Sequence, residues 1–436
     1  MRLPGQARMN GRAGVRLRLV ALLTAVGVAN VAYTVLIPFV PTLNSLFQMS
    51  AVLIGVAFAG FAAAKALSQP LGGWLVDRIG GRTIAIAGLA VTALATAALA
   101  LATTSAQVVA CRFVWGLGEG LAMPALYRLT AQLGNESGHG SDRTLGWFGT
   151  AAVAGMTVGP GLIALLSGVI DFRSAFAGGA LLTVLATALV ALAFRRGERP
   201  KVSPVSGGPP ATAERSPAGG GPPATAEGAE RLSRLPLIPL VLVLGVLDLA
   251  NNAVYAALEP LFPLHGTGPL GAGEQAVSVS FFLGLAVFAV FSWVGGRIVR
   301  LSRGFPLAAA VFAVQAAALA LAWVTGSYGV FTAAFIALMA VQPLVYVNMR
   351  AVIGRLGEGR QGWAFGWFGM VSDLGWVAGP IAATAAYQVL GGGSFALLAV
   401  VALAASALGA AAFPWLRAPF RQDSSGTPPV QETASA

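Results

Sequence analysis

Long apolar stretches separated by short polar gaps are the main pattern of this chain. A helix needs about 20 mostly apolar residues to cross a bilayer. Stretches of that kind recur along the whole chain, so we expect an all-α polytopic membrane protein with twelve transmembrane helices. The predicted helices cover residues 17–40, 51–75, 83–104, 106–131, 144–168, 172–194, 236–262, 275–297, 304–325, 328–349, 362–389 and 393–416.

Composition favours the same class of protein. Apolar residues make up 56% of the chain and charged residues only 10%, whereas soluble domains carry about 25% charged residues. So few charges cannot cover a soluble protein of this size, but lipid replaces water around a membrane protein. The net charge of +11 does not indicate nucleic-acid binding, because the arginines gather in alternate gaps between the predicted helices.

The arginines also predict the orientation of the chain. The gaps after even-numbered helices are basic, and we assign Arg350 to one of them, whereas the gaps after odd-numbered helices hold only Arg173. Basic residues stay on the cytoplasmic side, so we expect both termini there. The basic start leads into an apolar run without a cleavage site, which indicates an uncleaved first helix. Abundant Gly, Ala and Arg suggest a GC-rich bacterial genome, hence the bacterial inner (plasma) membrane.

One segment differs from the rest of the chain. Residues 195–234 are rich in Pro, Gly and Ala and have nothing to bury, so we predict a disordered cytoplasmic linker. It separates an N-terminal six-helix bundle, 1–194, from a C-terminal six-helix bundle, 235–416. A disordered cytoplasmic tail is expected at 417–436.

The two predicted bundles repeat one another. GWFGTAAVAGMTVGP starts at Gly146 and GWFGMVSDLGWVAGP at Gly366, an offset of 366 − 146 = 220. Other matching positions include Asn30 with Asn252, Tyr33 with Tyr255, and Tyr127 with Tyr346, together with neighbouring prolines. We therefore predict two pseudo-symmetric halves, as in transporters that rock two repeats about a site at the midplane.

Each copy of the repeated stretch ends in GxxxGP. Small residues four positions apart let helices approach closely, and proline bends the helix. We expect these residues to pack the fifth and eleventh predicted helices across the interface between the halves. The residues are Gly155, Gly159, Pro160, Gly375, Gly379 and Pro380.

GGWLVDRIGGR, in the predicted cytoplasmic gap after the second helix, resembles the loop signature G-x-L-x-D-R-x-G-R-[RK] of the major facilitator superfamily. The matching residues include Gly73, Asp77, Arg78, Gly80 and Arg82. Gly81 stands where the superfamily usually has the first basic residue. We expect Asp77 either to anchor the loop or to pair with cations of neighbouring helices and latch one conformation.

Two further stretches carry the resemblance. CRFVWGLGEG, with Arg112, resembles the R-x-x-x-G-x-G pattern of the fourth helix, and GMTVGP resembles the motif of proton-coupled drug exporters in this superfamily. The resemblance implies twelve helices, alternating access, and a central cavity lined by the first, fourth, seventh and tenth helices. It also implies a small-molecule substrate, a proton gradient as the energy source and no cofactor.

Ionisable residues at membrane depth are costly, roughly 2.5–3.5 kcal/mol each on insertion scales, so they usually face a cavity and function there. Glu119 and Asp248 lie near the predicted midplane and are our main candidates for the proton or cationic-substrate site, with Arg112 as a modulator. Asp248, Asn252, Tyr255 and Glu259 form one polar stripe at offsets 0, 4, 7 and 11. Glu259 has the alternative of lying at the outer interface.

Other intramembrane residues complete the predicted site. Asn30 and Tyr33 form a weaker polar stripe, and Trp115 is expected near the substrate. Asp373 has no charged counterpart in the first repeat, and we predict that it pairs with Lys65 of the second helix.

These features favour a secondary transporter that exports a drug or secreted metabolite in exchange for protons. Proton-coupled uptake of a small polar solute is the alternative. A membrane enzyme is not expected, because no clustered catalytic set or metal-ligand spacing occurs, and no GxxxxGK[ST] loop points to ATP. We expect a monomer whose partners are its substrate, protons and lipid, without nucleic acid.

Overall fold

The computed structural model describes residues 4–194, 237–298, 304–356 and 361–420. The predicted linker, and the tail from residue 421 onward, lie outside these ranges. The described residues form helices and their connections, and twelve of the helices have 20 or more residues. The first six are α1 (Pro4–Val35), α3 (Ala51–Ile79), α4 (Gly81–Ala100), α5 (Ser105–Ser137), α6 (Ser141–Leu165) and α7 (Phe172–Ala193). The second six are α9 (Leu237–Thr267), α10 (Glu274–Ile298), α11 (Gly304–Val324), α12 (Tyr328–Leu356), α13 (Gln361–Leu390) and α14 (Gly393–Phe420).

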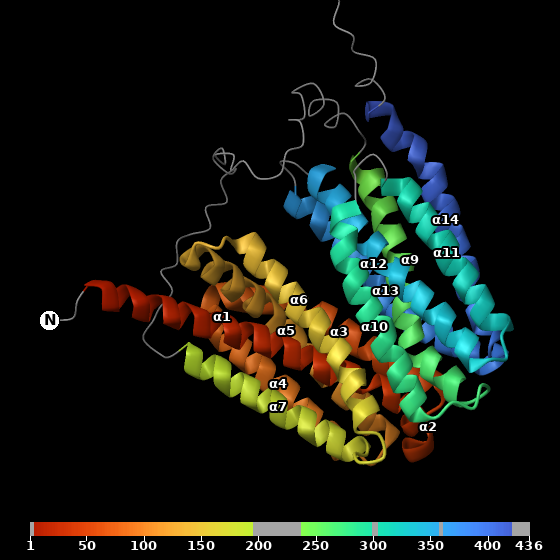
Figure 1. Cartoon of the computed structure of the whole chain (residues 1–436), viewed down its shortest axis with the longest axis horizontal. Helices are drawn as coiled ribbons and strands as arrows, with labels where there is room; N and C mark the ends of the chain where they lie inside the picture. Colours follow the sequence, from red (N-terminus) through yellow and green to blue (C-terminus); the bar gives the residue numbers. More distant parts are fainter. Residues whose placement is uncertain (1–3, 195–236, 299–303, 357–360, 421–436) are drawn as a thin grey trace, which may run out of the picture.

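The prediction of an all-α protein with twelve spanning helices in two bundles is confirmed (Figure 1). Ten of the helices are long and apolar enough to cross a membrane by composition alone. The two remaining long helices, α5 and α13, carry intramembrane charges that the sequence singles out: Arg112 and Glu119 on α5, and Asp373 on α13.

Helix ends differ from the prediction most clearly near the two ends of the chain. The first predicted helix ends at Val35 and continues as a 3-10 turn, η1 (Ile37–Phe39), and a short helix, α2 (Val40–Phe47). The prolines at the start of η1 and α2 cause this break, because proline has no backbone N–H to donate to the helix. At the other end of the chain, α14 runs to Phe420, four residues into the predicted tail.

The predicted loop signature is mostly helical. α3 extends to Ile79, and Gly80 alone separates it from α4. Gly80 has a φ of 102°, which residues with a Cβ rarely adopt. The glycine therefore makes the one-residue turn between the two helices.

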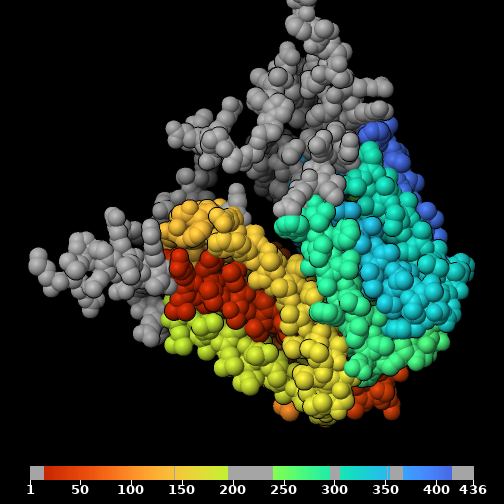
Figure 2. All heavy atoms as spheres, in the orientation of Figure 1, coloured from red at the N-terminus to blue at the C-terminus, as the bar shows by residue number. Residues whose placement is uncertain are grey.

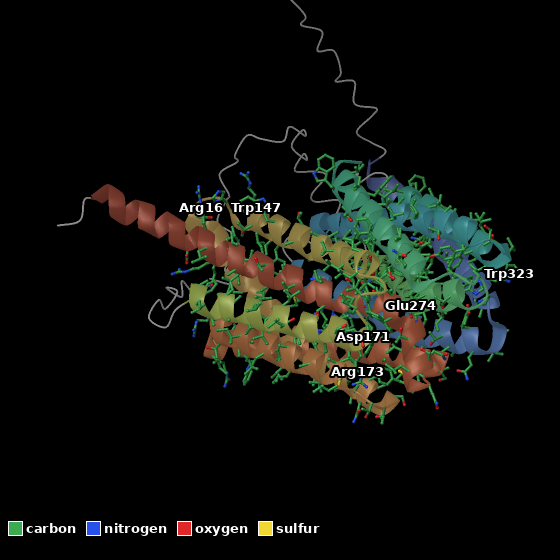
Figure 3. The ribbon with its side chains drawn as sticks, turned by 60° about the horizontal axis from the view of Figure 1, so that its bottom comes forward. Arg16, Trp147, Asp171, Arg173, Glu274 and Trp323 are labelled. Atoms are coloured by element: carbon green, nitrogen blue, oxygen red, sulfur yellow. The ribbon has the colours of Figure 1, made fainter. Side chains whose placement is uncertain are left out.

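The molecule has two distinguishable ends. We call the end where α7 finishes and α9 begins the linker end, and the opposite end, which carries α2, the far end (Figure 1). Arg16 and Trp147 lie toward the linker end of the N-terminal bundle, and Asp171 and Arg173 toward its far end (Figure 3).

The bundles touch toward the far end and separate toward the linker end. Figure 2 shows α6 against α10, with a gap between them that widens toward the linker end. Hydrogen bonds cross between the bundles at the far end, from the Thr42 hydroxyl to Glu274 Oε1 at 2.8 Å, and from Gln275 Nε2 to the Ala164 carbonyl at 3.3 Å. α3 also packs on α13 there, where Gly55 faces the Pro380 carbonyl. The described state is closed at the far end.

The glycines of the GxxxGP stretches pack within each bundle, so the prediction that they join the two halves is wrong for these glycines, whereas the Pro380 carbonyl does face Gly55 of the other bundle. Gly155 and Gly159 face α1, and a Cβ on Gly155 would lie 2.2 Å from the Gly27 carbonyl oxygen. Gly375 and Gly379 face α9 in the same way. The reason is pseudo-symmetry: each copy needs a close neighbour inside its own bundle, and the first helix of that bundle provides it.

Candidate functional site

An ion pair lies inside the N-terminal bundle at mid-helix depth. Lys65 Nζ of α3 is 2.9 Å from Glu119 Oε2 of α5. The close packing of the two helices sets this pair, because Gly120 places the α5 backbone directly against the Lys65 backbone. The Lys65 side chain is 31% exposed and the Glu119 side chain 6%. The carboxylate is thus buried behind its cation.

A second ion pair lies inside the C-terminal bundle. Arg350 Nη1 of α12 is 3.1 Å from Asp248 Oδ2 of α9, and the Arg350 side chain is 31% exposed while Asp248 is fully buried. Ser372 of α13 donates a short hydrogen bond to the same carboxylate oxygen. Asn252 donates to the Ser372 hydroxyl at 2.8 Å and to Asp248 at 3.4 Å. Three helices therefore fix one buried carboxylate.

Lys65 pairs with Glu119, so the predicted Lys65–Asp373 ion pair is not formed in this state. Asp373 is partly buried on α13 and has no ion pair or hydrogen bond with the described residues, although it lies within electrostatic range of Lys65 and Arg350. The physical reason is helix packing inside the N-terminal bundle: Gly120 brings α5 directly against the Lys65 backbone, so the ammonium group reaches Glu119 of its own bundle.

The matching tyrosines of the two repeats flank these charges. Tyr127 of α5 is 51% exposed and Tyr346 of α12 is 42% exposed. The Tyr127 phenol lies within electrostatic range of the Tyr346 phenol, Lys65 and Arg350. The guanidinium of Arg350 stacks on the Tyr346 ring, with 3.4 Å between Cζ and the ring centroid. The space between the bundles is therefore bordered by two phenols and two partly exposed cations.

A separate buried cluster closes the far side of this space. Tyr33 of α1 donates a 2.6 Å hydrogen bond to Glu259 Oε2 of α9, which joins the two bundles. Glu259 is only 1% exposed, so the alternative that it lies at the outer interface is wrong. Arg112 and Trp115 of α5 lie beside Tyr33 and are fully buried. Trp115 packs between aromatic rings.

The stripe on α9 is buried along its whole length and serves both clusters. Asp248 and Asn252 belong to the ion pair with Arg350, and Glu259 belongs to the far-side cluster. Tyr255 packs against Trp376 with its ring. Asn30 lies outside both clusters, because its side chain donates to the Val26 carbonyl one turn earlier.

The loop-signature residues lie away from these clusters. Asp77, whose side chain is 74% exposed, forms an ion pair with Arg128 of α5 in the same bundle. Arg82 donates to the Ala191 carbonyl at 3.3 Å, and Arg78 covers the Trp74 ring. In this state the Asp77 ion pair joins neighbouring helices of one bundle and does not bridge the two.

Arg350 and Ser372 are the site residues that sequence reasoning missed. Arg350 was assigned to a cytoplasmic gap, but α12 continues to Leu356 and carries it within reach of Asp248. A signal was present, because Ser372 and Asp373 are the polar departures of the second repeat from Ala152 and Val153 of the first. Sequence reasoning also missed a buried hydrogen-bond network inside the C-terminal bundle, which joins Asn251, Gln315 and Gln342.

Comparison with known proteins gives one family. A family model described as the Major Facilitator Superfamily matches residues 22–380. Multidrug resistance protein 1 of Bacillus subtilis (strain 168) is 26% identical over 181 residues, 42% of this chain and 46% of that protein. Quinolone resistance protein NorA of Staphylococcus aureus is 24% identical over 174 residues, 39% of this chain and 42% of that protein. The matched part of this chain thus spans less than half of these curated relatives.

Other similarities are shorter or lie in the fold alone. A probable nitrate/nitrite transporter, NarK2 of Mycobacterium tuberculosis, is 46% identical over 57 residues, 13% of this chain and 14% of that protein. The human organic anion transporter MFSD10 superposes with a TM-score of 0.62 at 18% identity, covering 91% of this chain and 99% of its own. A bacterial homolog of the human lysosomal transporter Spinster gives 0.66 at 14% identity, covering 92% and 96%.

Proposed function

Because the chain belongs to the Major Facilitator Superfamily, we propose that it exports a small organic molecule by proton-coupled antiport. At the level of the family, the chain is a multi-pass membrane transporter and not an enzyme. The names of two relatives, a multidrug resistance protein and a quinolone resistance protein, support export over uptake.

The observation that carries the proposal is the pair of ion pairs, one in each bundle. Lys65 and Arg350 border the space between the bundles, while their carboxylates, Glu119 and Asp248, are buried behind them. Protonation of either carboxylate removes the charge that holds its cation. A proton and a charged substrate thereby compete for the same electrostatic site, which is the requirement for exchange.

The direction of opening supports the same cycle. We propose that the linker end faces the cytoplasm, as the arginine distribution predicts. The described state is then open inward, with the far-side cluster sealing the other face. Rocking of the two bundles about the ion pairs would expose them alternately to the two sides.

Transport against an imposed pH gradient tests this function. The probes are ethidium and a fluorescent quinolone, compared between the parent protein, Glu119→Gln and Asp248→Asn in everted vesicles. Glu136→Gln, an exposed carboxylate on the same helix as Glu119, serves as the control for loss of a carboxylate away from the site. We expect probe uptake into acidified vesicles to stop when the proton gradient is collapsed and to fall at least about tenfold in both site variants. Transport that persists without the gradient would contradict antiport, and accumulation in the direction of proton flow would favour symport.

A further inference from the structure

Arg112 is a buried cation without a hydrogen bond. Its side chain is 0% exposed, and none of its three nitrogens has a partner among the described residues. Aromatic rings surround the guanidinium, with centroids at 4.4 Å for Phe61, 5.2 Å for Phe58 and Tyr33, and 5.3 Å for Trp115. Rings stabilise a cation through their faces, but they accept no strong hydrogen bonds. The donors of Arg112 are therefore unused in this state.

Further unpartnered polar atoms lie on or beside the residues of the far-side cluster. The indole nitrogen of Trp115, the hydroxyl of Tyr255 and Oε1 of Glu259 are buried without hydrogen-bond partners among the described residues. Buried polar groups are nearly always paired in folded proteins. Several of them, on α5 and α9, in the same buried region as an unpartnered guanidinium indicate a site for a polar ligand in another state of the cycle.

The counter-charge of Arg112 belongs to the other bundle. Glu259 lies within electrostatic range of the guanidinium but beyond ion-pair distance, and Tyr33 is hydrogen-bonded to it. Arg112 and its ring cage belong to α1, α3 and α5, whereas Glu259 belongs to α9. Opening of the far end must separate these helices. Arg112 then keeps its cage and loses its counter-charge.

We propose that Arg112 binds an anion when the far end opens, with the indole N–H of Trp115 as a second donor. The site would take a carboxylate or a small inorganic anion, because a guanidinium presents a planar fork of N–H donors that matches a carboxylate. Glu259 and the anion alternate as counter-charges to the same cation. This inference rests on the proposed alternating-access function, and it assigns the far-end-open state a ligand of its own.

The anion could be a carboxylate group of a transported molecule or a free inorganic ion, and the two would use the guanidinium differently. A carboxylate group of a transported molecule uses both arms of the fork, whereas a halide needs only a positive charge and one or two donors. Acetate and chloride are therefore the probes, and sodium HEPES, whose anion is bulky, is the reference salt. All three are compared at the same ionic strength.

Binding is measured by thermal unfolding of the purified full chain, without any transport step. Glu259→Gln removes the built-in counter-charge, so the site should accept an external anion. We expect acetate or chloride to raise the unfolding midpoint of this variant by about 3 °C or more, saturably, over the reference salt. The rise should disappear in Arg112→Met with Glu259→Gln and persist in Arg173→Gln with Glu259→Gln, the matched loss of another far-end arginine.

The remaining outcomes are also decisive. A rise with acetate alone identifies a carboxylate as the ligand, and a rise with chloride identifies a free inorganic anion. If Arg112→Met does not fold, Arg112→Lys replaces it and should weaken acetate binding at least about fivefold, because the fork is lost. Equal midpoints in all three salts for Glu259→Gln, or a rise that survives the loss of Arg112, would overturn the anion site. Either result leaves the vesicle assay of proton-coupled transport unaffected, so the two proposals fail separately.

Discussion

The ion pair between Arg350 and Asp248 allows the most quantitative prediction. Asp248 has no exposed surface, so Arg350→Met leaves a buried carboxylate without its cation. At a separation of 3.1 Å and an effective dielectric constant of about 20, the gross attraction is 332/(20 × 3.1), or about 5 kcal/mol.

The net loss is smaller than the gross attraction. The Arg350 side chain is 31% exposed, so solvent already screens part of the interaction. Ser372 and Asn252 continue to donate hydrogen bonds to the carboxylate after the substitution. Breaking a buried pair from one side typically costs 3–5 kcal/mol, and we expect about 2–4 kcal/mol for Arg350→Met.

A double-mutant cycle with Asp248→Asn separates the ion pair from general packing effects. The amide keeps the shape of the carboxylate and removes its charge. The double variant should therefore be more stable than Arg350→Met alone, with a coupling free energy of at least about 2 kcal/mol. The measurement is reversible chemical unfolding of the purified protein in detergent micelles. Additive losses, with a coupling below about 0.5 kcal/mol, would refute the interpretation that this pair determines the stability of the C-terminal bundle.

Two further predictions concern helix packing and partner choice in the N-terminal bundle. Gly155→Ala places a methyl group 2.2 Å from a backbone carbonyl oxygen of α1. It should therefore destabilise the protein by about 1–3 kcal/mol in thermal unfolding. The control Gly149→Ala, on the open face of the same helix, should have almost no effect. Lys65→Met should couple with Glu119→Gln by about 1 kcal/mol or more in a double-mutant cycle, and much less with Asp373→Asn; a stronger coupling with Asp373 would contradict the observed pairing.

Much of the architecture was present in the sequence. The apolar stretches predicted the twelve spanning helices, because hydropathy and helix length are local properties of the chain. The repeated GWFG stretches predicted two related bundles. The spacing of Asp248, Asn252, Tyr255 and Glu259 predicted one polar stripe, and all four are buried.

The choice of partners was decided only by tertiary structure. Lys65 pairs with Glu119 because glycine brings α5 onto α3, and no pattern within one helix reports which neighbour approaches closest. Arg350 looked like a cytoplasmic arginine until α12 placed it beside Asp248. The GxxxGP stretches likewise predicted close packing but not the helix that receives it.

Sequence therefore determined the elements, their duplication and the charges that lie at membrane depth. The structure decided which of those charges meet, since ion pairs depend on interhelical distance and on the rotation of each helix about its axis. Two carboxylates proved to be held by cations of their own bundles, and Glu259 proved to bond across the interface to Tyr33. Arg112 was left with aromatic rings and unused donors, because its counter-charge lies on the opposite bundle.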